Sequence, residues 1–254
     1  MSKLSNLALA CWAGLTVLAF SGGAVAGEQI TVNLANGKHI FAEGKPDTGV
    51  AACSSCHGEN AMGIDAMGSP RLANIGYTYI VKQLTNFAES ARTDATMGVM
   101  NDIAKGLTEQ DRRDLAAYEN SFPRTSEPSD LAALKEGGAA VGQSYLGQIL
   151  VRYGVKGKIS ACQTCHGFNG RGADPIYPKI AQQKYVYIVN QLTHWRDGSR
   201  ANDPLGQMRA IDKNLTDDDI HNAAAFLSQA ADTTPGGGME VENQTVLSRV
   251  KILK

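Results

Sequence analysis

Two short segments of the 254-residue chain place two thiols beside an imidazole. The first is Cys-Ser-Ser-Cys-His at residues 53–57, and the second is Cys-Gln-Thr-Cys-His at residues 162–166. Two thiols at this spacing can form thioethers with the vinyl groups of one haem, and the adjacent imidazole can bind its iron. The sequence therefore predicts two covalently bound haem c groups. The predicted attachment residues are Cys53, Cys56, Cys162 and Cys165, and the predicted axial ligands are His57 and His166.

Two other interpretations of the cysteines stay open. Each pair could form a disulfide, or the four thiols could bind one zinc ion. The zinc interpretation leaves both following histidines unexplained and requires two separate domains to share one metal. The repeated histidine therefore favours haem attachment.

The cysteine motifs belong to an internal repeat. They lie 109 residues apart, and downstream the offset settles at 108, where residues 70–87 and 178–195 share nine of 18 identical positions. Two copies indicate a tandem duplication, in which each copy is its own small domain.

Each copy has a helical pattern. Tyr77, Ile80, Val81, Leu84 and Phe87 recur at three- and four-residue steps, and equivalent apolar residues recur over residues 185–195. Two Thr-x-x-Asp segments, at residues 108–111 and 216–219, suit helix starts. We therefore expect an all-α fold with about three to four helices in each copy. The expected boundaries are 1–26 for a signal peptide, 27–122 for the first domain, 123–143 for a linker, 144–232 for the second domain and 233–254 for a tail without an assigned role.

A methionine in each copy could close the second axial face of the iron, where a thioether stabilises the ferrous state. Met100 and Met208 each precede the Leu-Thr of the last helix by seven residues, and they follow their motif histidines by 43 and 42 residues. These matched loops predict Met100 and Met208 as ligands. The alternatives are Met97 in the first copy and Met239 in the second.

A proline follows each motif histidine at a similar distance. Pro70 and Pro178 come 13 and 12 residues after their histidines. A haem-ligating histidine normally donates its second ring N–H to a fixed acceptor, and the carbonyl of a rigid proline loop would serve. An ordinary turn proline is the alternative.

The N-terminus is typical of export. Residues 1–26 combine Lys3, a 14-residue apolar run and a small-residue ending at Ala26. The run is shorter than the roughly 20 residues that span a bilayer, so we expect cleavage after Ala26 and a periplasmic protein. An uncleaved anchor remains the alternative. The net charge of −1 argues against a nucleic-acid-binding protein.

Together these residues resemble the cytochrome c4 family over residues 36–230. The resemblance rests on both cysteine motifs, the proline segments, the Gln-Leu pairs of the repeated helix, the methionine loops and the Leu-Thr helix starts. It implies two tandem class I cytochrome c domains, His/Met coordination of both irons, and haems that face each other near the domain interface. It also implies electron delivery from a quinol-oxidising complex or a periplasmic dehydrogenase to a terminal oxidase.

We therefore predict an electron carrier rather than an enzyme, with redox proteins as partners and a possible peripheral association with a membrane complex. The oligomeric state is left open. The alternatives are a haem-bearing subunit of a dehydrogenase complex and a dihaem enzyme, either a peroxidase or a sulfur-compound dehydrogenase. The net charge is −3 over residues 27–125 and +1 over residues 126–254, which predicts different partners and potentials for the two haems.

Overall fold

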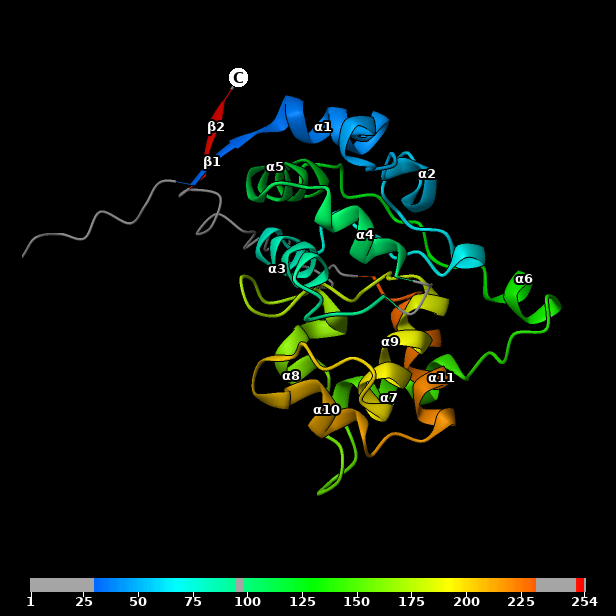
Figure 1. The fold of residues 1–254 in the computed structure, drawn as a ribbon. Coiled ribbons are helices and arrows are strands. Elements are labelled where there is room, and N and C mark those ends of the chain that lie inside the picture. Colours follow the sequence, from blue (N-terminus) through cyan, green and yellow to red (C-terminus); the bar gives the residue numbers. More distant parts are fainter. Residues whose placement is uncertain (1–29, 95–97, 232–249, 254) are drawn as a thin grey trace, which may run out of the picture.

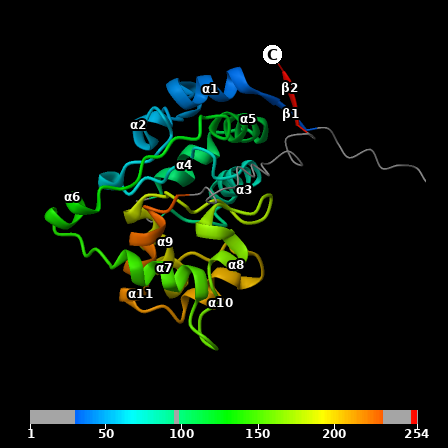
Figure 2. The same ribbon diagram turned by 180° about the vertical axis from the view of Figure 1, so that it is seen from behind.

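Two helical halves lie one above the other in the computed structural model, which describes residues 30–94, 98–231 and 250–253 (Figure 1). The upper half contains α1 (Leu34–Glu43), α2 (Ser54–His57), α3 (Tyr77–Ala88), α4 (Val99–Lys105) and α5 (Glu109–Glu119). The lower half contains α7 (Ser144–Tyr153), α8 (Gln163–His166), α9 (Tyr185–Asp197), α10 (Gln207–Asp212) and α11 (Asp217–Leu227). Between them α6 (Leu131–Glu136) stands to one side (Figure 2). The short 3₁₀ turns are η1 (Pro46–Thr48), η2 (Asp65–Met67), η3 (Phe168–Gly170) and η4 (Pro204–Gly206).

The expected all-α fold of two repeated domains is confirmed. The predicted helices are α3 and α5 in the first half and α9 and α11 in the second. Each half also has a further long helix, α1 or α7, and two short helices that carry the cysteine motif and the methionine loop. Both Thr-x-x-Asp segments form capping boxes, in which the threonine and the aspartate satisfy each other's backbone N–H groups.

Each half buries its own apolar core. The predicted helix stripe packs inward, with Tyr77, Ile80, Leu84 and Phe87 buried in α3. In α9 the equivalent buried residues are Tyr185, Ile188 and Trp195. The first and last long helices of each half cross closely at a glycine, because a Cβ at Gly37 or Gly147 would overlap a backbone carbonyl of the opposite helix.

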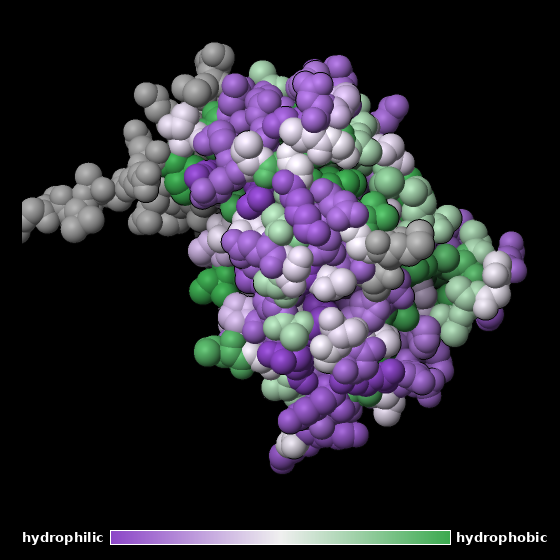
Figure 3. Space-filling model, viewed as in Figure 1, coloured by the Kyte–Doolittle hydropathy of each residue, from purple (hydrophilic) through white to green (hydrophobic). Residues whose placement is uncertain are grey.

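The first and the last described segments of the chain pair with each other beside α1. Strand β1 (Ile30–Asn33) pairs in parallel with β2 (Val250–Leu253), an arrangement that the sequence pattern does not predict. The segment 1–26, Met97 and Met239 lie outside the described residues, as does most of the tail. Among the residues that the structure describes, no helix is long and apolar enough to span a bilayer. Hydrophilic side chains dominate the face in Figure 3, with scattered apolar residues between them.

Candidate functional site

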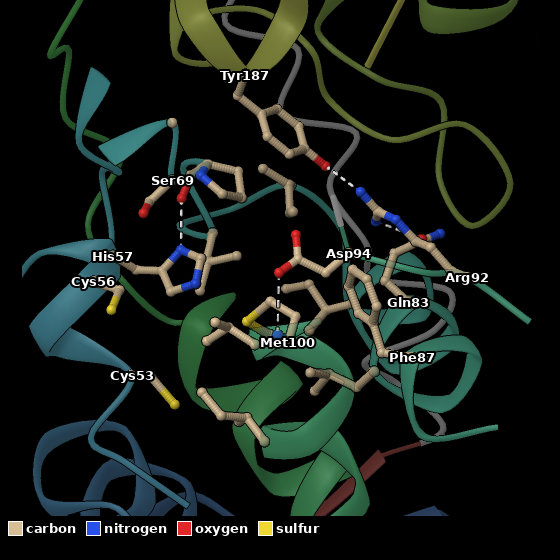
Figure 4. A pocket seen from close by; sticks show the side chains of 18 of the residues that line it. Cys53, Cys56, His57, Ser69, Gln83, Phe87, Arg92, Asp94, Met100 and Tyr187 are labelled. Carbon is tan, nitrogen blue, oxygen red and sulfur yellow. Dashed lines mark hydrogen bonds between the residues drawn. The ribbon is translucent and has the colours of Figure 1, made fainter. Parts of the chain in front are cut away.

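A cavity of about 340 Å³ lies beside the first cysteine motif and extends to the second half of the chain. Its walls include Cys53, Cys56 and His57 from the segment of α2, and Met100 from α4. Figure 4 shows the motif residues along one side of the cavity, with Met100 and Arg92 across from them. Pro178 and Tyr187, among others, extend the lining into the second half.

Both motif histidines are held in one orientation by a proline carbonyl. The distance from Nδ1 of His57 to the oxygen of Pro70 is 2.9 Å, and that from Nδ1 of His166 to the oxygen of Pro178 is 2.8 Å. Burial lowers the pKa of both imidazoles, which favours the neutral ring. A neutral ring that donates from Nδ1 leaves its Nε2 lone pair available to a metal.

The four motif cysteines form no disulfide with one another, which leaves all four sulfurs available for haem attachment. Burial raises the pKa of the Cys53 and Cys162 thiols. The two motifs lie in different halves (Figure 1), an arrangement that does not suit one shared zinc ion. Among the described residues, no group of three or more His, Cys, Asp and Glu side chains could hold a metal ion.

Met100 and Met208 occupy equivalent short helices. Each helix begins at a glycine with positive φ, 76° at Gly98 and 67° at Gly206. Met100 is half-buried, packs against the first core and lines the cavity. Met208 is half-buried in α10, which packs on α9. The structure therefore gives both methionines the same place in the repeat.

A polar cluster that no motif predicts joins the two halves. Arg92 donates to Gln83 of its own half at 2.8 Å, and to Tyr187 and Gln191 of the other half at 3.1 and 2.8 Å. Arg200, which is 108 residues further on, makes the equivalent hydrogen bonds in the other direction across the junction. It donates to Gln191 at 2.6 Å, to Tyr79 at 3.1 Å and to Gln83 at 3.1 Å. We call these six residues the interdomain arginine cluster.

The two arginines of this cluster are buried cations. Arg92 is 7% exposed and stacks on Phe87, and Arg200 is 5% exposed and stacks on Trp195. Among the described residues, no carboxylate forms an ion pair with either guanidinium at salt-bridge distance. Although burial opposes the change, the two positive charges lower the pKa of Tyr79.

Buried cations without an anionic partner are costly, so this cluster is suited to receive negative groups. A porphyrin carries two carboxylates, and both arginines line the cavity that also contains the first cysteine motif. The residues present therefore fit haem: thiols for attachment, a neutral imidazole for the iron, apolar walls for the ring and guanidiniums for its carboxylates.

Two buried carboxyl groups lie near the attachment thiols and were not predicted from the sequence. Burial raises the pKa of Glu119 to about 8, and burial together with the charge of Asp203 raises the pKa of Asp212 to about 8. One oxygen of each carboxyl is buried without a hydrogen-bond partner among the described residues. Both groups are therefore neutral under mildly acidic conditions.

Comparisons with known proteins agree with this site. Residues 34–121 match the family described as "Cytochrome c", and residues 154–227 match "Cytochrome C oxidase, cbb3-type, subunit III". A cytochrome c4 of Stutzerimonas stutzeri is 30% identical over 78% of this chain and 94% of its own length. The chain belongs to the cytochrome c4 family. It contains two cytochrome c domains with two covalently bound haem c groups.

Two further relatives have names that refer to thiosulfate oxidation. A "Thiosulfate dehydrogenase electron acceptor" of Stutzerimonas stutzeri is 33% identical over 80% of this chain and 89% of its own length. The structure titled "Thiosulfate dehydrogenase (TsdBA)" from Marichromatium purpuratum matches with a TM-score of 0.67 and 28% identity. The match covers 77% of this chain but only 40% of that longer chain.

We predict that the arginine cluster raises the potentials of both haems. Replacing Arg92 or Arg200 by Gln removes a positive charge that disfavours the ferric state, so midpoint potentials should fall by an amount on the order of 50 mV. A spectroscopic redox titration measures this shift. Arg113→Gln is the matched control, because Arg113 pairs with Glu109 on the surface. Unchanged midpoint potentials in both arginine variants would contradict the prediction that the arginine cluster raises the haem potentials.

We also predict that stability falls as the pH rises from about 5 to about 8. Glu119 titrates near 4.5 when unfolded and at about 8 in the folded protein, so the native state binds more protons in this window. Glu119→Gln should reduce this pH-dependent loss of unfolding free energy by up to about 1.4 kcal/mol per pH unit. Denaturant unfolding of the holoprotein at several pH values measures it. The control Glu109→Gln should keep the wild-type slope; an equal slope in Glu119→Gln refutes the prediction.

Proposed function

We propose that this dihaem cytochrome accepts electrons from a periplasmic dehydrogenase and passes them to a terminal oxidase. Thiosulfate dehydrogenase is the donor that the names of the relatives favour. The observation that carries the proposal is the cavity beside the first motif, because residues of both halves line it. Two haem sites that share one polar junction suit transfer of an electron from one iron to the other.

The proposed iron ligands are His57 with Met100 in the first domain and His166 with Met208 in the second. The supporting evidence is twofold. The imidazoles are fixed by hydrogen bonds to the carbonyl oxygens of Pro70 and Pro178, and the two methionines lie on equivalent helices. Cys53, Cys56, Cys162 and Cys165 would hold the porphyrins. Haem supplies reversible one-electron chemistry when bound. The residues named above would hold the porphyrin and fix its orientation.

An iron closed by two protein ligands favours electron transfer over substrate chemistry. The two halves are built alike around their motifs, whereas a dihaem enzyme needs one iron with an exchangeable position. We therefore propose a carrier without substrate chemistry of its own. The match to part of the longer TsdBA chain also supports a second candidate, a haem subunit that stays bound to a dehydrogenase.

We further propose that residues 1–26 direct export and are cleaved after Ala26. The domain limits proposed from the sequence, 27–122 and 144–232, contain the matched family regions 34–121 and 154–227. Association with a membrane complex would then be peripheral.

Replacing Met100 or Met208 by Ala should open one iron in each variant. Each variant should bind carbon monoxide at one haem and lose the methionine-to-iron charge-transfer band of that haem. Absorption spectra of the oxidised and the reduced protein measure both effects. Met62→Leu is the control, because Met62 is buried in the first core and is not among the residues that line the cavity. Carbon monoxide binding by the wild-type protein, or unchanged bands in Met208→Ala, would refute the proposed ligation.

The proposed donor can be tested directly. Purified thiosulfate dehydrogenase with thiosulfate should reduce both haems of the oxidised cytochrome, which a stopped-flow record of the haem absorption follows. Omitting thiosulfate is the control. If this enzyme fails to reduce the cytochrome while a quinol-oxidising complex succeeds, the donor proposal is wrong. Co-purification of the cytochrome in a fixed ratio with a dehydrogenase would favour the second candidate.

A further inference from the structure

The first helices of the two domains, α1 and α7, are structural equivalents. Each has ten residues, crosses the last helix of its domain at a glycine, and ends at a glycine with positive φ. A short turn follows each helix, closed by the backbone bridge of Lys45 with Val50 in one domain and of Val155 with Ile159 in the other. The outward faces of α1 and α7 can therefore be compared position by position.

These outward faces differ in character. On α7, Tyr145, Ile149 and Tyr153 recur at four-residue steps and are 62%, 51% and 74% exposed. Eight residues of helix span about 12 Å, so the three side chains form one stripe. The α1 residues in these positions are Ala35, His39 and Glu43, which are also exposed. The duplication thus presents the same helix twice, once with small or polar side chains outward and once with large apolar and aromatic ones.

The turn that follows each helix differs in charge. After α7, Val155 is 42% exposed, and Lys156 and Lys158 are both exposed. After α1, the turn contains one lysine, Lys45, whose charge is paired with Asp111, and one acidic residue, Asp47. Tyr145, Ile149, Tyr153, Val155, Lys156 and Lys158 are together called the α7 face.

The α7 face borders the segment that holds the second haem. The side chain of Gln163, at the start of α8, donates to the carbonyl oxygen of Arg152 at 2.7 Å, in the last turn of α7. The same arginine stacks on Phe168, just beyond the second motif. Figure 2 shows α7 beside α8, in the half of the molecule opposite α1. A protein bound to this face would therefore lie close to the second haem.

We propose that the α7 face is the docking surface for the electron-donating dehydrogenase, which presents acidic residues around an apolar centre. Exposed aromatic and aliphatic side chains in one stripe match the composition of energetically important interface residues. Lysines at the edge of the stripe steer an acidic partner and favour one orientation. The inference rests on the proposed function as a carrier, and it adds which domain receives the electron first.

Two double variants test this surface. Ile149→Ser with Tyr153→Ser removes the apolar anchors, and Lys156→Glu with Lys158→Glu reverses the charge. The matched control is His39→Ser with Glu43→Ser on α1. The probe is purified thiosulfate dehydrogenase with thiosulfate, and ascorbate serves as a small reductant that needs no docking. Haem spectra and helical circular dichroism check that each variant is folded and loaded.

With the dehydrogenase, we expect the second-order rate of reduction to fall at least tenfold in the serine double variant. In the glutamate double variant, the rate at low salt should be lower than that of the wild type. The wild-type rate should decrease as the ionic strength rises, and the rate of this variant should not. The α1 control and all ascorbate rates should match the wild type.

Three other outcomes would overturn the proposed docking surface. Wild-type rates in both α7 variants overturn the docking surface and leave the carrier function intact. A dehydrogenase that reduces neither wild type nor variants overturns the proposed donor, and the docking inference with it. Binding of the wild type to anionic lipid vesicles, lost in the same variants while dehydrogenase rates persist, assigns the face to a membrane and overturns the proposal.

Discussion

Two buried guanidiniums at the junction impose the central constraint on this molecule. Arg92 and Arg200 each donate to oxygens of both domains, and each stacks on an aromatic ring of its own domain. Their charges need a negative partner, and porphyrin carboxylates at the edge of the cavity would supply it. The same contacts would then hold the domains together and fix the cofactors near each other. In this arrangement the same bonds would contribute both to cohesion between the domains and to communication between the irons.

The two copies of the tandem repeat are alike around the cysteine motifs and differ on the surface of the molecule. The residues that orient the proposed haem ligands are duplicated almost position by position, from the prolines whose carbonyl oxygens bind the histidines to the glycines that precede the methionine helices. The outward faces of α1 and α7 carry no such requirement, and their residues differ in size and polarity. The repeat is therefore kept around the two cysteine motifs and lost on the outward faces of α1 and α7.

The cofactor and the all-α fold could be predicted from the sequence, because covalent haem attachment requires a fixed local spacing and long amphipathic helices have a clear period. The arginine cluster could not, because Arg92 and Arg200 acquire their burial only when the two domains meet. Their 108-residue separation was the available signal. Helices α4 and α10 are short, and each follows a glycine with positive φ instead of a side-chain N-cap, so no capping pattern in the sequence predicts where they begin. Nor does any local pattern indicate that residues 30–33 pair with residues 250–253.

The parallel pairing of β1 with β2 has a practical geometric consequence. It brings the first and the last described residues together beside α1, at the pole of the molecule opposite α7 (Figure 1). A fusion partner, a lipid anchor or an electrode linked through either strand would therefore attach at one pole. The opposite pole, with the α7 face, would remain turned toward the surrounding solution.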